Sequence, residues 1–484
     1  MRRTILPAFG LLAALAGCNA VGPDFVPPAS GLPDGAFVAG ARTSAPDPQW
    51  WASFRDPTLT ALVREVAESN LDVRTATLRV AESRFERGVT ASAEMPSLNG
   101  DAKVTREQYS KNGILSLFNG LAPGGSVNVP PISDHFVGFD ASWELDIWGR
   151  VRRSVESADA QVQVTEDQRR DALLSVMAET ARDYIELRGV QVQVGVLNDN
   201  VQVAESVLKL ADERQAKGMQ SALDTENARA QLEADRAQIP PLQQQESELV
   251  NALSFLTDQP PGALRARLGE RRKSLLALAS APTGVASDLA RRRPDIRAAE
   301  AQLHAATAQT GVAVADFYPR VTLSGQGGLD SLNPNTLFRT SSLQWNVGPS
   351  ISVPIFEGGR LKNTLELREA QQQEALISYR KTVLRAWHDV VNALVALRLE
   401  KVRHTRLSEQ VLHARKAADI ARDRYRDGVT EFINVLDAER TRLSAEQQQA
   451  QSAATLGVDQ VQLYKALGGG WEASFPAEQA ALQP

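Results

Sequence analysis

The single cysteine, Cys18, is the residue whose type and position point most directly to a chemical reaction. Arg2 and Arg3 precede an apolar run over residues 5–16, and Gly17 stands immediately before the cysteine. This order is typical of a signal peptide that ends in a lipobox. We expect cleavage before Cys18, a diacylglycerol on its thiol and a further acyl chain on its amine, because several chains anchor a protein stably. An ordinary signal peptide that happens to contain a cysteine is the alternative.

The residues after Cys18 indicate which membrane receives the protein and how the chain could span it. Residue 19 is asparagine rather than aspartate, which in the enterobacterial sorting rule favours the outer membrane and makes its lipid the expected partner of the acyl chains. No later run of about 18 apolar residues could form a transmembrane helix. If the chain spans a membrane, the sequence predicts that it does so through β-strands.

Other residue types give no catalytic, metal or cofactor pattern. There is no Walker loop, nucleophile elbow or set of Rossmann glycines. The five histidines show no metal-ligand spacing, and no second cysteine could join them; they are His135, His304, His388, His404 and His413. A net charge of −5 without a basic tract argues against nucleic acid as a partner. We therefore expect no enzyme activity, no bound metal and no cofactor.

The most informative feature is an internal repeat. Gly149, Gly218 and Leu187 each have the same residue type 210 positions later, at Gly359, Gly428 and Leu397. Gly88 and Pro96 instead have matches 223 positions later, so the first copy contains 13 additional residues (223 minus 210). We assign these to the segment 109–134, which is rich in glycine, asparagine and proline. A constant register over this distance indicates two copies of one structural unit.

Each copy contains two stretches that predict strands. Apolar and polar residues alternate in 137–147 and in 342–355, which predicts strands at 135–147 and 342–355. Weaker partner strands are predicted at 97–109 and 320–330. Period two predicts one apolar and one polar face, and the lengths suit tilted transmembrane strands. Two half-buried hairpins in a soluble domain are the alternative. Since four strands cannot close a barrel and open edges are not tolerated in lipid, a barrel requires several chains.

Each copy continues into helices too long for a compact domain. No proline occurs from Arg150 to Gln215, and apolar or small residues recur there at spacings of three and four. About 65 residues of helix would reach roughly 100 Å. We expect the chain to reverse at Gly218 and at Gly428, because glycine accepts a positive φ. Pro240 and Pro241 predict a kink or a short break in the first return helix, which the second copy lacks.

These patterns divide the chain into six parts. We expect a signal peptide at 1–17 and a lipidated segment at 18–56. The first repeat spans 57–257 with its hairpin tip near 218, and the second spans 285–467 with its tip near 428. A linker that belongs to an equatorial region spans 258–284, and a tail spans 468–484.

Four motifs resemble one known family. The sequence RRRPDIRAAE at 291–300 is similar to the motif that opens the second repeat of TolC-like outer-membrane factors. WELDIWGR at 143–150, DFYPRV at 316–321 and PIFEGGR at 354–360 are also similar to that family, and more narrowly to its NodT branch of lipoprotein efflux channels. The resemblance covers about residues 20–470, nearly the whole chain.

The resemblance implies a mainly α-helical homotrimer. Four strands per chain would form a twelve-stranded membrane β-barrel, continuous with a long periplasmic α-helical barrel and an equatorial domain. It implies the outer-membrane channel of a tripartite efflux system. The expected partners are a periplasmic adaptor (membrane fusion) protein and an inner-membrane pump of the resistance-nodulation-division class.

The resemblance also implies a periplasmic gate. Tyr425 and Asp437 match the tip tyrosine and one acidic ring position of the family, and Asp224 lies where the family's acid pairs with that tyrosine. Asn434 replaces the second ring acid, and Thr430 replaces the latch arginine. A hydrogen bond between Tyr425 and Asp224 would stabilise a closed state by about 1.5–3 kcal/mol. The tips at Gly218 and Gly428 would dock the adaptor.

Two other classes of protein share some of these features. A periplasmic adaptor lipoprotein would have the lipobox, but one helical hairpin and a split lipoyl-like domain. A lipoprotein enzyme acting on the cell wall would need a carboxylate or nucleophile cluster in a compact domain. Trypsin treatment of intact cells separates a duct from an adaptor, because only a duct exposes the loop at 109–134 outside.

Overall fold

The computed structural model describes residues 20–32, 47–110, 130–219, 221–269 and 292–472, and the chain divides into two compact units. Unit 1 comprises Met1–Pro27, Glu82–Val162 and Ala301–Ile377. Unit 2 comprises Pro28–Ala81, Gln163–Glu300 and Ser378–Pro484. The predicted signal peptide, Cys18 and most of the segment 109–134 lie outside the described residues.

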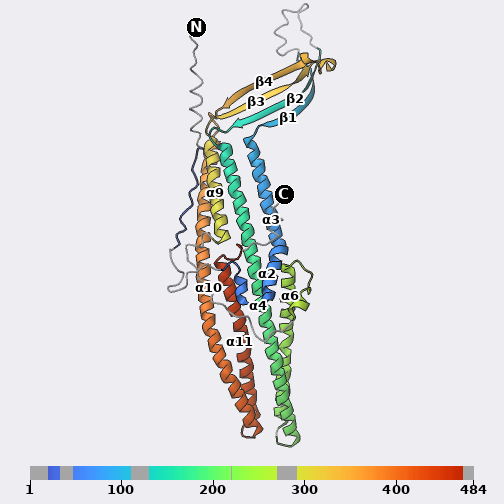
Figure 1. Ribbon diagram of the computed structural model, residues 1–484, viewed down its shortest axis with the longest axis vertical. Helices are drawn as coiled ribbons and strands as arrows, with labels where there is room; N and C mark the ends of the chain where they lie inside the picture. Colours follow the sequence, from blue (N-terminus) through green and yellow to red (C-terminus); the bar gives the residue numbers. More distant parts are fainter. Residues whose placement is uncertain (1–19, 33–46, 111–129, 220, 270–291, 473–484) are drawn as a thin grey trace, which may run out of the picture. The chain divides into compact units, whose positions relative to one another are not determined.

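The elements follow the predicted repeat (Figure 1). Each copy runs from a helix through two strands into a very long helix, a turn and a return helix. In chain order the helices and strands are α2 (Pro57–Ser69), α3 (Leu71–Ala91), β1 (Ser97–Glu107), β2 (Ile132–Leu145), α4 (Arg150–Ala216), α5 (Ala222–Ala237), α6 (Ile239–Leu256), α7 (Arg265–Leu268), α9 (Pro294–Ala315), β3 (Arg320–Ser331), β4 (Leu343–Ser352), α10 (Arg360–Arg426) and α11 (Phe432–Ala466). Short 3₁₀ turns occupy Trp50–Phe54, Ser92–Glu94, Pro334–Thr336 and Thr340–Ser342.

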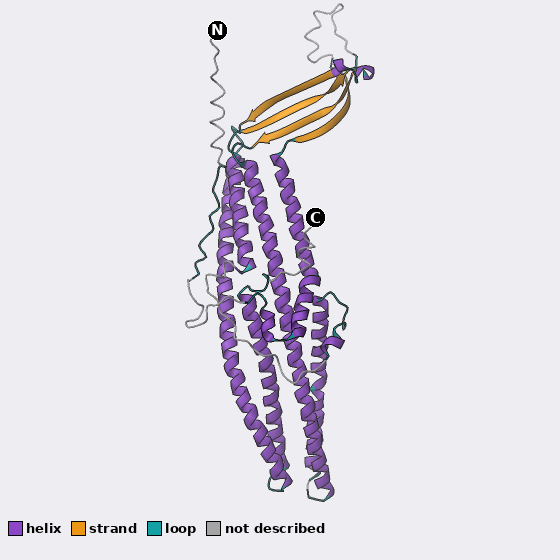
Figure 2. Ribbon diagram, viewed as in Figure 1, coloured by secondary structure: helices purple, strands orange, loops and turns teal. Residues whose placement is uncertain are grey.

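The strands of unit 1 form one antiparallel sheet in the order β1-β2-β3-β4 (Figure 2). Each strand pairs with its neighbour in sequence, so the two repeats contribute adjacent hairpins that join between β2 and β3. The register places Phe139 opposite Gly100 and Gly327, and Gly327 opposite Trp345. The four antiparallel strands predicted from period two are present.

This register gives the sheet one apolar and one polar face. Residues directly opposite one another on antiparallel strands point to the same face. One face therefore carries rows that include Ala102, Val137, Leu329 and Leu343. The other carries hydrogen-bonded amides and carboxylates: Asn99 Nδ2 donates to Asp140 Oδ2 at 3.1 Å, and Gln344 Nε2 donates to Asp330 Oδ2 at 2.9 Å.

The apolar face is largely exposed in a single chain. Trp345 is 73% exposed, Phe139 63% and Val347 65%. Large apolar side chains rarely stay exposed together unless another surface covers them. Of the helices in the described ranges, none is both long and apolar enough to cross a membrane.

A short N-terminal arm packs on the helices of unit 1. Val21 N donates to Trp148 O at 3.0 Å, and the buried Arg153 pairs with Asp24. The Phe25 ring stacks on His304 with centroids 4.4 Å apart. Because Arg153 belongs to α4 and His304 to α9, the arm contacts both repeats.

The main apolar core of unit 2 joins the start of the first repeat to the middle of α4, to α6 and α7 and to the end of α11. Its largest members come from the 3₁₀ turn at Trp50–Phe54, from α2 and from the middle of α4. Asp56 caps α2 by accepting from Thr58 N at 2.8 Å, and it also accepts from the buried Tyr184 hydroxyl at 2.8 Å. A cap that pairs with Tyr184 fixes α2 against the long helix.

The two helical hairpins of unit 2 differ in their return arms. The long helices α4 and α10 contain 67 residues each. The return arm of the first hairpin is interrupted at Gln238, so α5 and α6 are separate, whereas α11 continues through 35 residues. The break that Pro240 and Pro241 predict is confirmed, because proline is accepted only in the first turn of α6.

Candidate functional site at the hairpin tips

Both hairpins end in the same kind of turn. Gly218 has φ of 71° and Gly428 has φ of 74°. Met219 N donates to Arg214 O, and Val429 N donates to Arg424 O, at 3.0 and 2.8 Å. These bonds, with those from the two glycine amides, make Schellman motifs, which require the left-handed conformation that glycine adopts at least cost. The sequence correctly predicts the reversal at each glycine.

Each tip exposes two apolar side chains at equivalent positions of the repeat. Met219 is 58% exposed and Leu223 is 65% exposed on the first hairpin. Val429 is 64% exposed and Ile433 is 46% exposed on the second. Apolar groups at the same two positions of both copies form surfaces on which another helix can pack.

Tyr425, the predicted tip tyrosine, joins the two hairpins. Its side chain is 4% exposed, and its ring lies 5.4 Å from that of Phe432. The guanidinium of Arg214, from the first hairpin, lies 4.7 Å from the Tyr425 ring centroid. Arg214 Nη1 also donates to the Tyr425 carbonyl oxygen. Apolar residues of both hairpins surround this contact, among them Val207, Ala211, Ala228, Val435 and Leu436.

The other predicted gate residues lie within the first two turns of the return helices. Asp437 is exposed on α11. Asn434 is exposed too, and its Nδ2 donates to Thr430 Oγ1 at 3.0 Å, so the two departures from the family's tip motif bond to each other. Asp224 is half-buried in the first turn of α5. Its predicted bond to Tyr425 stays a prediction.

A second group of polar contacts links the hairpins farther from the tips. Asn200 of α4 accepts from Arg442 Nη2 and donates to Glu446 Oε2, the latter at 3.2 Å. Nearer the protein surface, Gln447 Nε2 donates to Gln238 Oε1 at 3.0 Å. The contacts of Asn200 join α4 to α11, and the contact of Gln447 joins α11 to the break after α5.

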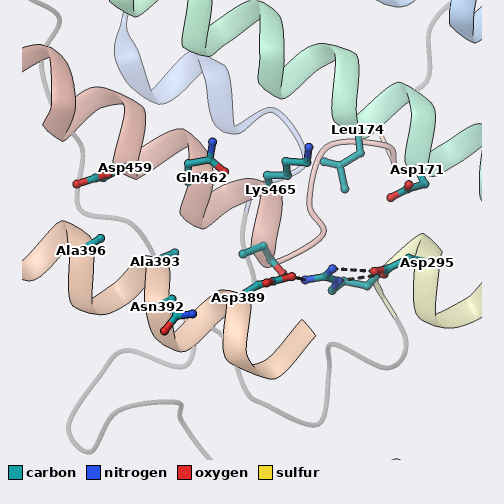
Figure 3. A pocket seen from close by; sticks show the side chains of 12 residues that line it. Asp171, Leu174, Asp295, Asp389, Asn392, Ala393, Ala396, Asp459, Gln462 and Lys465 are labelled. Atoms are coloured by element: carbon teal, nitrogen blue, oxygen red, sulfur yellow. Dashed lines mark hydrogen bonds and ion pairs between the residues drawn. The ribbon is translucent and has the colours of Figure 1, made fainter. Parts of the chain in front are cut away.

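Unit 2 also contains a cavity of about 450 Å³ lined by charged side chains (Figure 3). Arg293 bridges Asp295, at 2.7 Å, and Asp389, at 3.3 Å. Burial, and then the charge of Asp295, raise the pKa of the Asp171 carboxyl above its ordinary value. Burial and the charge of Glu400 likewise raise the pKa of Asp459. In both acids the surroundings therefore make the charged form less favourable than it is in water.

Arg214 and Asn200 are functional candidates that the sequence patterns do not predict. Arg214 appears in the repeat only as the equivalent of Arg424, and Asn200 is one polar residue in a long helix. No sequence signal distinguishes them, because their partners are more than 200 residues away in the chain. Within the described ranges there is no group of three or more histidine, cysteine, aspartate or glutamate residues that could hold a metal.

Comparisons with known proteins identify the family. The family described as "Outer membrane efflux protein" matches residues 62–258 and 285–469. The chain is 31% identical over 490 residues to the solvent efflux pump outer membrane protein SrpC of Pseudomonas putida, covering 98% of this chain and 100% of SrpC. It is 30% identical over 439 residues to the pyoverdine export outer membrane protein OpmQ of Pseudomonas aeruginosa, covering 90% of each.

A solved structure supports the same assignment. The structure of the outer-membrane channel OprN matches with a TM-score of 0.86 and 34% identity, over 94% of this chain and 100% of that one. The predicted family, fold class, membrane and transport function are thereby confirmed, and the alternatives of an adaptor or a cell-wall enzyme are excluded. The chain belongs to the outer membrane efflux protein family, and it is a non-enzymatic, TolC-like channel of the outer membrane that extends into the periplasm.

Proposed function

We propose that the channel is a homotrimer in which three sheets close one twelve-stranded β-barrel and the hairpins form a twelve-helix tube. The main support for this proposal is the sheet, which in the described part of the chain has two unpaired edges and an exposed apolar face. Among the described residues, β1 and β4 each pair along one edge only, and the face they share is apolar and exposed. Unpaired strand edges are not tolerated in lipid, so β4 of one chain pairs with β1 of the next.

The channel completes a tripartite system. Its partners are a periplasmic adaptor, which contacts the tips around Gly218 and Gly428, and an inner-membrane pump of the resistance-nodulation-division class. The exposed Met219 and Val429 support docking, because an adaptor helix can cover apolar groups that the equivalent turns present. The relative SrpC is named as the outer membrane protein of a solvent efflux pump.

The tips act as a gate. Three copies of Asp437 around the axis form a ring of negative potential that attracts cations and narrows the pore. The exposure of Asp437 supports this role, since a carboxylate buried against its own chain would not face a lumen. Asn434 occupies the second ring position without a charge. A bond between Tyr425 and Asp224 stabilises the closed state until the adaptor binds.

Cys18 carries the lipid anchor. The residue lies two positions before Ala20, which packs so closely on Gly149 that a Cβ there would lie 2.4 Å from the Ala20 Cβ. This contact supports a defined start for the anchored segment at the junction of β2 and α4. Cys18→Ser should release the acyl chains and leave the barrel as the membrane attachment.

The test is single-channel recording of the purified, lipidated protein in a planar bilayer. The wild type should give small, cation-preferring steps. Asp437→Ala should enlarge the steps and weaken the preference for cations, because the ring loses its charge. Asp199→Ala, which removes an exposed carboxylate on α4, is the matched control and should behave as the wild type.

Three results are informative. Steps that Asp437→Ala leaves unchanged would keep the channel and move the gate to another position. A monomeric or dimeric mass by light scattering would contradict the trimer. The absence of any conductance from a lipidated trimer would contradict the assembled duct.

A further inference from the structure

The polar contacts at Asn200 form a buried group between the hairpins. Asn200 is 4% exposed, and the side chains of Glu446 and Arg442 are 6% and 12% exposed. Both ends of the asparagine amide are used: Oδ1 accepts from Arg442, and Nδ2 donates to Glu446 and to its own Val196 carbonyl at 2.8 Å. Hydrogen bonds to buried charged groups are the stronger kind, so this contact strongly links α4 to α11.

The charged partners are also satisfied without Asn200. Glu446 accepts from Arg415 at 2.7 Å, and Arg442 pairs with Glu439 at 2.8 Å. All of these charges belong to α10 and α11, the second hairpin. If α4 moves away, no charge is left without a partner, and Asn200 keeps its bond to Val196. The contact can therefore break reversibly, whereas an ion pair shared between the hairpins would leave a buried charge.

The interface between α4 and α11 changes character at this level. On the side away from the tips the helices touch through small residues: a Cβ on Gly189 would lie 2.5 Å from the Ala454 Cβ, and a Cβ on Gly457 would lie 2.8 Å from Ile185. Toward the tip, Val207 and Ala211 meet Leu436 in the smaller apolar cluster of the hairpin ends. Asn200 therefore lies between the region where α4 and α11 pack most closely and the apolar cluster at the tips.

We propose that Asn200 is the lock of the tip gate, because its amide holds the second hairpin through Arg442 and Glu446 and releases it when the tips open. This inference rests on the proposed gate. It assigns the control of opening to a buried contact 14 residues, or about 21 Å of helix, from Arg214 at the tip. The close packing of α4 against α11 at Gly189 and Gly457 stays intact during opening, so the two helices separate only on the tip side of Asn200.

The direct test measures the distance between the tips. Spin labels are attached through Lys217→Cys and Asp427→Cys, both exposed positions in the terminal turns. Labelled full-length chain is mixed with excess unlabelled chain, so that each oligomer holds one labelled pair, and the distance distribution is recorded in detergent. Asn200→Leu, which keeps the branching and the number of side-chain atoms but loses both hydrogen bonds to the second hairpin, should raise the ratio of long to short distances about tenfold.

Gln447→Ala is the matched control, because it removes an exposed inter-hairpin hydrogen bond and should leave the distances unchanged. Asn200→Ser, a smaller change that keeps a hydroxyl, should give a shift in the same direction and guards against misfolding of Asn200→Leu. Unchanged distances in both Asn200 variants would overturn the proposal, as would an equal shift in Gln447→Ala. The distance measurement does not depend on channel activity. A wild type without conductance would contradict the proposed duct, whereas the distances would still decide whether Asn200 links the hairpins.

Discussion

Arg214 of the first hairpin covers the ring of Tyr425 of the second, with the guanidinium carbon 4.7 Å from the ring centroid. The same side chain donates to the Tyr425 carbonyl oxygen. One arginine thus binds both the aromatic face and the backbone at the end of α10, where helix carbonyls carry partial negative charge. The repeat-related Arg424 is exposed instead, so the two copies of the sequence use equivalent arginines differently.

Arg214→Ala should weaken the contact between the tips. Loss of the cation–π contact and of a charge-assisted hydrogen bond should lower the local free energy of opening by about 1–3 kcal/mol. Hydrogen exchange at the amides of residues 424–436 measures this. Arg424→Ala is the control and should change the exchange by less than about 0.5 kcal/mol. Equal effects of the two variants would show that the stacking is not a specific link.

Gly428→Ala should strain the second tip. A residue with a Cβ at φ of 74° costs about 1–2 kcal/mol, and the Schellman turn that shapes the tip depends on this conformation. We expect faster proteolysis at the tip. Gly195→Ala, where the added Cβ meets no atom within 4 Å, should instead be neutral or slightly stabilising because α4 is helical there. A tip as resistant as in the wild type would contradict the strain argument.

Phe139→Arg should disrupt insertion of the sheet. Phe139 lies on the apolar face and is 63% exposed in one chain, so in the proposed barrel it faces lipid. An arginine at such a position destabilises by about 2–4 kcal/mol. Urea unfolding in lipid vesicles measures the loss. Asn346→Arg, on the polar face, should be tolerated much better. Equal losses from both variants would mean that the two faces do not differ in environment.

Asp171→Asn should change how stability depends on pH. Burial raises the pKa of Asp171 above its ordinary value of 3.8, so the folded state binds the proton more tightly than the unfolded state. The stabilisation from protonation is complete at low pH and is lost as pH rises through the raised pKa. The amide that replaces the carboxyl in the variant is neutral at every pH. The variant should therefore have the higher melting temperature at pH 7, and the difference should vanish at pH below about 4. A lower melting temperature at pH 7 would contradict a burial penalty at this site.

The regular elements followed from local pattern. Period-two alternation predicts 135–147 as a strand, and β2 spans Ile132–Leu145. The strand predicted at 342–355 ends earlier, at Ser352 of β4, although alternation continues through Val353 and Ile355. β4 ends where its partner β3 begins, with Arg320 opposite Ser352. Alternation in the sequence predicts which side chains share a face of the sheet. Where a strand ends depends on the length of the neighbouring strand with which it pairs.

The sequence by itself determined the repeat, the turns and the lipobox expected at Cys18. These features depend on interactions between residues that are close in the chain. Examples are the backbone conformation of the glycines at 218 and 428, the helix break at the proline at 240, and the alternation of side chains along each strand. Only the tertiary structure decided that Arg214 meets Tyr425, that Asn200 meets Arg442 and Glu446, and that four acids share a cavity. Those partners lie on different helices, often far apart in sequence, and their contacts depend on the rotation and offset of packed helices, which periodicity alone leaves open.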